Sequence, residues 1–120
     1  GAFKAGSYGA QTIEQLDPFN NIIEVVPGKR GLNAFTHTAL ASKLKKHGVT
    51  NIILAGTVTS ICIDSTARTA VELGFNVAIL SDCTSSRTPF EQTFYCEEVF
   101  PLYASVCESD TFIKHWRGHG

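Results

Sequence analysis

Apolar and polar positions along the chain alternate in a way that predicts strands and helices in turn. Short apolar runs bounded by glycine, proline or polar residues indicate buried strands. Longer stretches with apolar residues three or four positions apart indicate amphipathic helices. We therefore expect strands at residues 21–26, 51–55, 76–80 and 104–107 and helices at residues 10–16, 33–47, 59–74, 88–100 and 110–116.

This alternation predicts an α/β fold, a three-layer α-β-α sandwich whose parallel sheet is covered by helices on both faces. A chain of 120 residues with 43% hydrophobic content can bury a core, so we expect a single domain over residues 1–120. Ligands of such sheets bind beyond the carboxyl ends of the strands. Lys29, Cys62 and the expected loop at residues 81–87 all follow predicted strands, and we expect them at that edge.

Cys62 is the strongest candidate for a reactive side chain. It follows a predicted strand and falls three residues after Thr59, a candidate helix N-cap. Unpaired amides and the positive end of the helix dipole at such a position favour a thiolate over a thiol. The alternative is a buried cysteine that packs as a small hydrophobic residue. The negative charge of nearby Asp64 weighs against the thiolate.

The composition narrows the classes of function. A net charge of -1 argues against binding to nucleic acid or to a membrane surface. No apolar run approaches membrane-spanning length, and the first residues do not resemble a signal peptide. The four cysteines (Cys62, Cys83, Cys96 and Cys107) are scattered unlike a disulfide scaffold, so we expect free thiols and a cytoplasmic protein. No spacing indicates a metal site, and we expect neither a metal nor a cofactor.

With these residues in place, the sequence resembles the isochorismatase-like cysteine hydrolase superfamily, which includes nicotinamidases and ureidoacrylate amidohydrolases. The stretches that carry the resemblance are KRGLNAF at 29–35, GTVTSIC at 56–62, STARTA at 65–70, GFNV at 74–77 and SD at 81–82. Their order and spacing both fit. The GTVT form of the motif is most similar to the ureidoacrylate-amidohydrolase-like branch, but the pattern does not name a substrate.

The resemblance implies cleavage of a C–N bond, amide or ureido, in a small molecule through a Cys62 thiolate and an acyl-enzyme. It implies a lysine that assists the cysteine, at the position of Lys29, although a solvated loop lysine is the alternative. It also implies a non-proline cis peptide between Thr57 and Val58, which aims the amides of Val58 and Cys62 at a developing oxyanion. Arg30 is a weaker candidate for substrate contact.

Cys83 is another weak candidate for contact with the substrate, because it follows a predicted strand at the same edge. Passive packing is the alternative for this side chain. The low fraction of charged residues, 18%, and the resemblance both suggest a homo-oligomer.

One residue of the family pattern has no counterpart in the sequence. The third catalytic residue of the superfamily is an aspartate that follows a first strand, and no aspartate of this chain stands in that context. The resemblance therefore predicts an N-terminally incomplete domain. The chain is then a fragment of a longer enzyme, a chain whose missing strand comes from a second chain, or a degenerate member without catalysis.

Two other chemistries remain as alternatives. Vinyl-ether hydrolysis, as in true isochorismatases, does not need a cysteine nucleophile, so Cys62 favours C–N cleavage. The spacing of Cys62 and Arg68 also matches that of cysteine-dependent phosphatases. In that class a glycine-bearing loop wraps the phosphate with its amides, whereas this segment contains Asp64 and has a helical pattern.

Overall fold

The computed structural model describes residues 26, 29 and 31–119 of the chain, with side chains up to residue 115. The helix predicted at residues 10–16, the strand predicted at 21–26 except for its last residue, and Arg30 lie outside the described residues.

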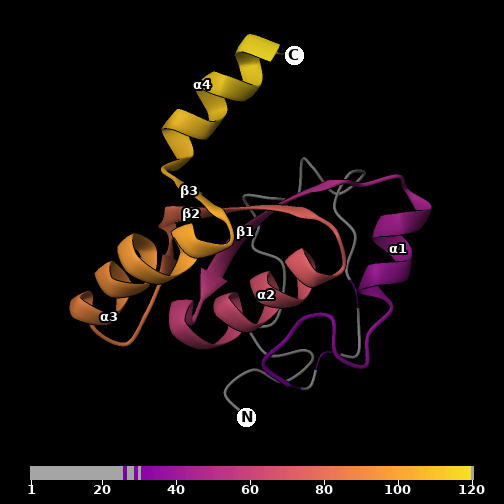
Figure 1. Ribbon diagram of the computed structural model, residues 1–120, viewed down its shortest axis with the longest axis horizontal. Coiled ribbons are helices and arrows are strands. Elements are labelled where there is room, and N and C mark those ends of the chain that lie inside the picture. The colour runs from indigo at the N-terminus through magenta and orange to yellow at the C-terminus, as the bar shows by residue number, and fades with distance from the viewer. Residues whose placement is uncertain (1–25, 27–28, 30, 120) are drawn as a thin grey trace, which may run out of the picture.

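Three parallel strands form the sheet of the described part (Figure 1). They are β1 (Asn51–Thr57), β2 (Asn76–Ser85) and β3 (Ser105–Cys107), in the order β1-β2-β3. Each parallel neighbour is reached by a crossover through helical segments, as expected for βαβ units. The strands predicted at 51–55, 76–80 and 104–107 are therefore present, and the α/β class with a parallel sheet is confirmed.

Strand β2 is longer than the sequence predicted, because residues 81–85 of the expected loop continue the strand. Gly56 and Thr57 pair with Thr84 and Ser85 after an irregularity in which β1 advances from 54 to 56 while β2 advances from 79 to 84. Gly56 has a φ of 126°, a conformation that favours glycine. The polar composition of residues 81–85 indicated a loop, but pairing with β1 decides their conformation.

Helix α2 (Asp64–Glu72) lies against the sheet and contributes its small residues to the core (Figure 1). Ala67 and Ala70 of this helix are completely buried, and such small side chains let a helix backbone approach the strands closely. The buried apolar side chains of the described part are Ile63, Ala67, Ala70, Phe75, Val77, Ile79 and Phe100.

Helix α1 (Leu40–Lys46) is shorter than the predicted helix at 33–47. His37 has a φ of 56°, outside the helical region, and its side chain is exposed. Residues 31–39 form turns instead, and the side chain of Asn33 accepts the N–H of Phe35 at 2.9 Å in one of them. The helical period of the sequence is therefore realised only in the second half of the predicted range.

The predicted helix at 88–100 is present but changes its winding along its length. It begins as α3 (Pro89–Phe94), continues as the π-helical turn η4 (Tyr95–Val99) and ends as the 3-10 turn η5 (Phe100–Leu102). Its start is confirmed, because the hydroxyl of Thr88 accepts the N–H of Glu91 at 3.1 Å.

Helix α4 (Ser109–His119) projects from the rest of the described chain (Figure 1). Asp82 on β2 binds its first residue, accepting the N–H of Ser109 at 2.8 Å and its hydroxyl at 2.5 Å. These bonds from Ser109 hold the pKa of Asp82 below its usual value. A carboxylate at a helix amino terminus also interacts favourably with the helix dipole.

Candidate active site

Cys62 lies in the turn directly beyond the carboxyl end of β1. The peptide bond between Thr57 and Val58 is cis, at the position that the resemblance implied. Residues Thr59–Ile63 then form a π-helical turn, η3, which runs into α2. The carbonyl oxygen of Val58 accepts two N–H groups of this turn, each at 3.1 Å. Cys62 is half-buried and lies at the start of a helical segment.

Thr59 does not cap this helical segment, contrary to the prediction from its position. Val58 occupies the N-cap position, and no side chain caps the turn. Thr59 lies inside the turn, is completely buried, and donates its hydroxyl to Oε1 of Gln92 at 2.5 Å. A buried hydroxyl needs a partner, and here the partner from α3 replaces the local backbone amide.

Ser60, the next residue of the turn, contacts Glu91, the residue before Gln92 on α3. The hydroxyls of Ser60 and Ser86 both donate to Oε1 of Glu91, and Arg87 donates to Oε2 at 2.8 Å. These hydrogen bonds lower the pKa of Glu91 from 4.5 to about 2. The bond from Arg87 contributes most, followed by those from Ser60 and Ser86. From the sequence, Glu91 was expected only to take part in the N-terminal cap of the helix that begins at Thr88.

The pKa of Glu91 predicts how the stability of this region depends on pH. Because the pKa is lower in the folded protein, the ionised carboxylate stabilises the fold above about pH 4.5, and this contribution disappears as the pH falls towards 2. We expect the unfolding free energy of the wild type to exceed that of Glu91→Gln at neutral pH, and the difference to vanish near pH 2.

Urea denaturation at a series of pH values measures that difference. Glu98→Gln removes an exposed negative charge from the same helical stretch and controls for the change in net charge. A difference between wild type and Glu91→Gln that stays constant from pH 7 to pH 2 would contradict the bonded, low-pKa carboxylate.

Lys29 is exposed, and its ammonium donates a 2.7 Å hydrogen bond to a backbone carbonyl two residues on. The segment behind it is fixed on α2, because Asn33 donates to the carbonyl of Ser65 at 3.1 Å and to the hydroxyl of Thr69 at 2.6 Å. The sequence did not single out this asparagine for that role. No hydrogen bond joins Lys29 to Cys62 in the described part, and their joint action stays a prediction.

Cys83 lies on β2 and is exposed, with its thiol donating to Oδ1 of Asp82 at 3.6 Å. Its role in substrate contact also stays a prediction. All four cysteines are free thiols, as the sequence predicted. Burial raises the pKa of Cys96, which lies on η4 and packs against the core.

The spacing of Cys62 and Arg68 does not form a phosphate-binding loop. The residues between them belong to η3 and α2, so their backbone is helical. Nε of Arg68 donates to both carboxylate oxygens of Asp64, at 3.0 Å each. The guanidinium is therefore paired within its own helix, and the geometry that a cysteine-dependent phosphatase requires is not found here.

The described residues contain no group of three or more histidine, cysteine, aspartate or glutamate side chains that could hold a metal ion. In the same part of the chain, no helix has the length and apolar character needed to cross a membrane.

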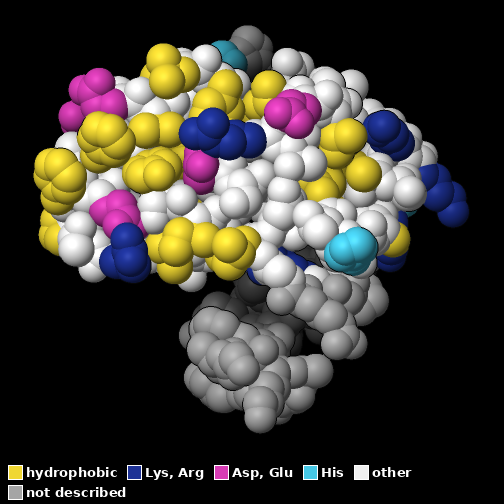
Figure 2. Space-filling model, turned by 60° about the horizontal axis from the view of Figure 1, so that its bottom comes forward, with side chains coloured by type: hydrophobic (Ala, Val, Ile, Leu, Met, Phe, Trp, Pro, Cys, Tyr) yellow, Lys and Arg dark blue, Asp and Glu magenta, His cyan; other side chains and the backbone are white. Residues whose placement is uncertain are grey.

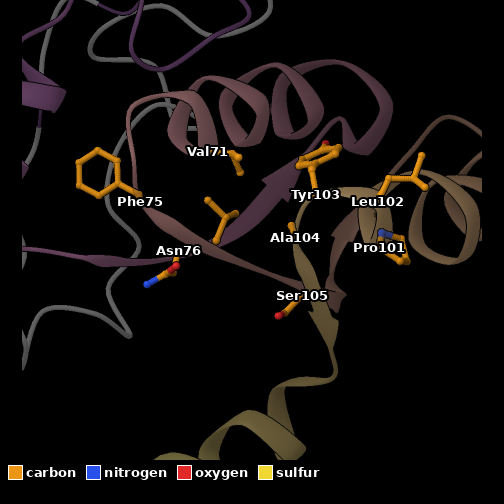
Figure 3. A pocket seen from close by; sticks show the side chains of 9 residues that line it. Val71, Phe75, Asn76, Pro101, Leu102, Tyr103, Ala104 and Ser105 are labelled. Atoms are coloured by element: carbon orange, nitrogen blue, oxygen red, sulfur yellow. The ribbon is translucent and has the colours of Figure 1, made fainter.

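A cavity of about 410 Å³ opens at the amino-terminal ends of β2 and β3, the opposite end of the strands from Cys62. Figure 3 shows its lining around the end of α2 and the start of β3. Because Cys62 follows the carboxyl end of β1, this cavity is not part of its surroundings. The lining residues are Val71, Phe75, Asn76, Val77, Pro101, Leu102, Tyr103, Ala104 and Ser105.

Apolar side chains are also exposed on the surface. Phe90 and Leu102 are 79% and 82% exposed. Figure 2 shows one face on which apolar side chains gather, with a few charged groups between them. Apolar atoms contribute a large share of the surface of most folded proteins, and we assign these residues no function.

Comparison with known proteins identifies the family. The Isochorismatase domain matches residues 1–111 of the chain. The chain therefore belongs to the isochorismatase family, in agreement with the resemblance of its motifs.

Three relatives illustrate the match. An uncharacterized isochorismatase family protein of Escherichia coli O157:H7 is 37% identical over 84 residues, which cover 70% of this chain and 44% of that protein. The maleamate amidohydrolase of Pseudomonas putida is 39% identical over 64 residues, covering 53% of this chain and 30% of that enzyme. The structure of an isochorismatase-like hydrolase from Alkaliphilus metalliredigens matches with a TM-score of 0.77 and 32% identity, over 92% of this chain and 59% of that chain.

Similar solved structures also include nicotinamidases, so the family contains hydrolases of the amidohydrolase type. The matched part of this chain spans about half the length of several of these proteins.

Proposed function

We propose that the whole protein is a cysteine hydrolase that cleaves a C–N bond, amide or ureido, in a small molecule. The observation that carries this proposal is the position of Cys62, half-buried in the turn that follows β1 and the cis peptide and leads into α2. A thiol at the start of a helical segment is favourably placed to react as a thiolate. The similarity to a maleamate amidohydrolase and to nicotinamidases supports the type of bond.

In the proposed reaction the aspartate of the family pattern takes the proton of the Cys62 thiol, and the sulfur attacks the carbonyl carbon and forms an S–C bond. The carbonyl oxygen becomes an oxyanion that accepts hydrogen bonds from the N–H groups of Val58 and Cys62. The loss of one such donor typically lowers the rate about 10²- to 10³-fold. The C–N bond then breaks, and the nitrogen leaves as an amine or ammonia after it takes a proton from Lys29. Water then hydrolyses the thioester: it gives its hydroxyl to the released acid and a proton to Lys29, and the aspartate returns its proton to the sulfur, which restores the thiol.

The family pattern adds an aspartate that exchanges protons with the cysteine and the lysine. We place this aspartate on a strand that the whole protein or a second chain of a homo-oligomer supplies beside the described sheet. The proposal needs a small-molecule substrate and involves neither a nucleic acid nor a membrane.

Trapping of the acyl-enzyme tests the proposal. The whole protein is mixed with a panel of small amides and ureido compounds, quenched in acid, and analysed by intact mass and peptide mapping. We expect an acyl adduct on Cys62 and release of one equivalent of ammonia or amine in the first turnover. Cys107→Ala, which removes a thiol on β3, should leave the adduct in place. An adduct on Cys83 in place of Cys62 would contradict the proposal.

A further inference from the structure

We propose that Gln92, on α3, is a positioning residue that sets the geometry of the turn carrying Cys62. This inference rests on the proposed function, in which Cys62 is the nucleophile. Gln92 does not act on the reacting atoms. It acts through Thr59, which stands three residues before Cys62 in the same π-helical turn.

The amide of Gln92 joins two separate elements. Its Oε1 accepts the hydroxyl of Thr59 at 2.5 Å, and its Nε2 donates to the carbonyl of Ser81 at 3.1 Å and to the hydroxyl of Thr84 at 3.0 Å. The carbonyl of Ser81 can only accept, so the NH₂ group must face β2. The carbonyl oxygen of the amide must then face the turn, and the orientation of Gln92 is fixed.

Burial makes these contacts hard to replace. Thr59 is 0% exposed and Thr84 is 8% exposed, so water has little access to either hydroxyl. The hydroxyl of Thr84 donates onward to the carbonyl of Leu80 at 3.1 Å, which extends the connection along β2. A turn whose buried hydroxyl has a single fixed acceptor is held in one position relative to the sheet.

A second connection runs beside the first. Ser60, the next residue of the turn, donates to Glu91, the residue before Gln92 on α3. Two adjacent residues of the turn are therefore bound to two adjacent residues of the first turns of α3. Because α3 is also bound to β2, these bonds fix the position of the turn that carries Cys62 relative to β2.

The test is a double-mutant cycle of Thr59→Val, Gln92→Leu and the combined variant in the whole protein. The rate of alkylation of Cys62 by iodoacetamide is measured by peptide mapping, with exposed Cys83 in the same sample as a reference for the reagent. Each single change should slow alkylation of Cys62 about tenfold, because the reactivity of a thiol depends on its exposure and on the amides around it. The combined variant should be no slower than the singles, since both changes remove the same connection.

Two controls separate positioning from a general loss of stability. Thr59→Ser keeps the hydroxyl and should retain the alkylation rate of the wild type. Thr38→Val removes a hydroxyl that donates to the carbonyl of Ala34 at 2.6 Å, away from the turn. It should lower the melting temperature without changing the reactivity of Cys62.

The proposed role of Gln92 is overturned if Gln92→Leu lowers only the melting temperature, if the two single effects add, or if Thr38→Val slows alkylation equally. Alkylation requires no substrate, so it reports on Gln92 whether or not an acyl-enzyme forms. An acyl adduct on Cys62 together with unchanged alkylation of Gln92→Leu would remove this inference and leave the proposed function in place.

Discussion

Cys62→Ala is expected to abolish turnover of the small-molecule amide by the whole protein, with a loss of about 10⁴-fold or more in kcat. The reason is that the covalent route needs a sulfur to form the acyl-enzyme, and no other thiol lies in the turn that follows β1. The change removes a half-buried side chain, so the melting temperature should change little. Release of ammonia or amine under saturating substrate measures kcat.

Cys107→Ala provides the matched control for this experiment, because it removes a half-buried thiol on β3. It should keep the turnover of the wild type. Residual activity of Cys62→Ala close to that of the wild type would exclude a cysteine nucleophile and, with it, the proposed function.

Phe100→Ala is expected to lower the free energy of unfolding by about 3–5 kcal/mol, the usual cost of truncating a buried aromatic side chain. Phe100 is completely buried, and its ring makes edge contacts with those of Tyr95 and Tyr103 at centroid distances of 5.7 and 6.2 Å. The change leaves a cavity where η4 and η5 meet the sheet. Urea denaturation at neutral pH measures the loss.

Phe90→Ala is the control, because Phe90 belongs to the same helical stretch but is 79% exposed. Substitutions at such surface positions usually change stability by less than about 0.5 kcal/mol. Equal losses for the two variants would show that Phe100 is not part of the core.

The described strands could be predicted from the sequence because their signal is local. Apolar runs at residues 51–55 and 76–80 mark two of the strands, and β1 and β2 begin at the residues where these runs begin. The burial predicted for the first run is wrong: β2 carries buried side chains, whereas Ile53 on β1 is 42% exposed. The start of α3 was also predictable, since Thr88, Pro89 and Glu91 form a capping pattern within four residues. In each of these cases the signal lies within a few consecutive residues of the chain.

The surroundings of Cys62 could not be predicted in the same way. Thr59 has the composition and position of an N-cap, but its acceptor is Gln92, which is 33 residues away in the sequence. Glu91 was recognisable as a capping residue, whereas its bond to Ser60 depends on how α3 packs beside the turn. Such contacts follow from the tertiary arrangement, which overrides local preferences.

Where the pairing of β1 and β2 is irregular, β2 contains more residues than β1. This irregularity limits which insertions and deletions the chain can accept. Side chains on a regular strand change face at every residue, yet Ile79 and Thr84, five residues apart, are both buried, because β2 advances by five residues where β1 advances by two. A deletion of one residue within 80–83 would keep Thr84 on this face but shorten the segment that brings the Ser81 carbonyl and the Thr84 hydroxyl to Gln92. We expect natural and laboratory variants to tolerate substitutions in this short stretch more readily than a frame-preserving deletion of a single residue.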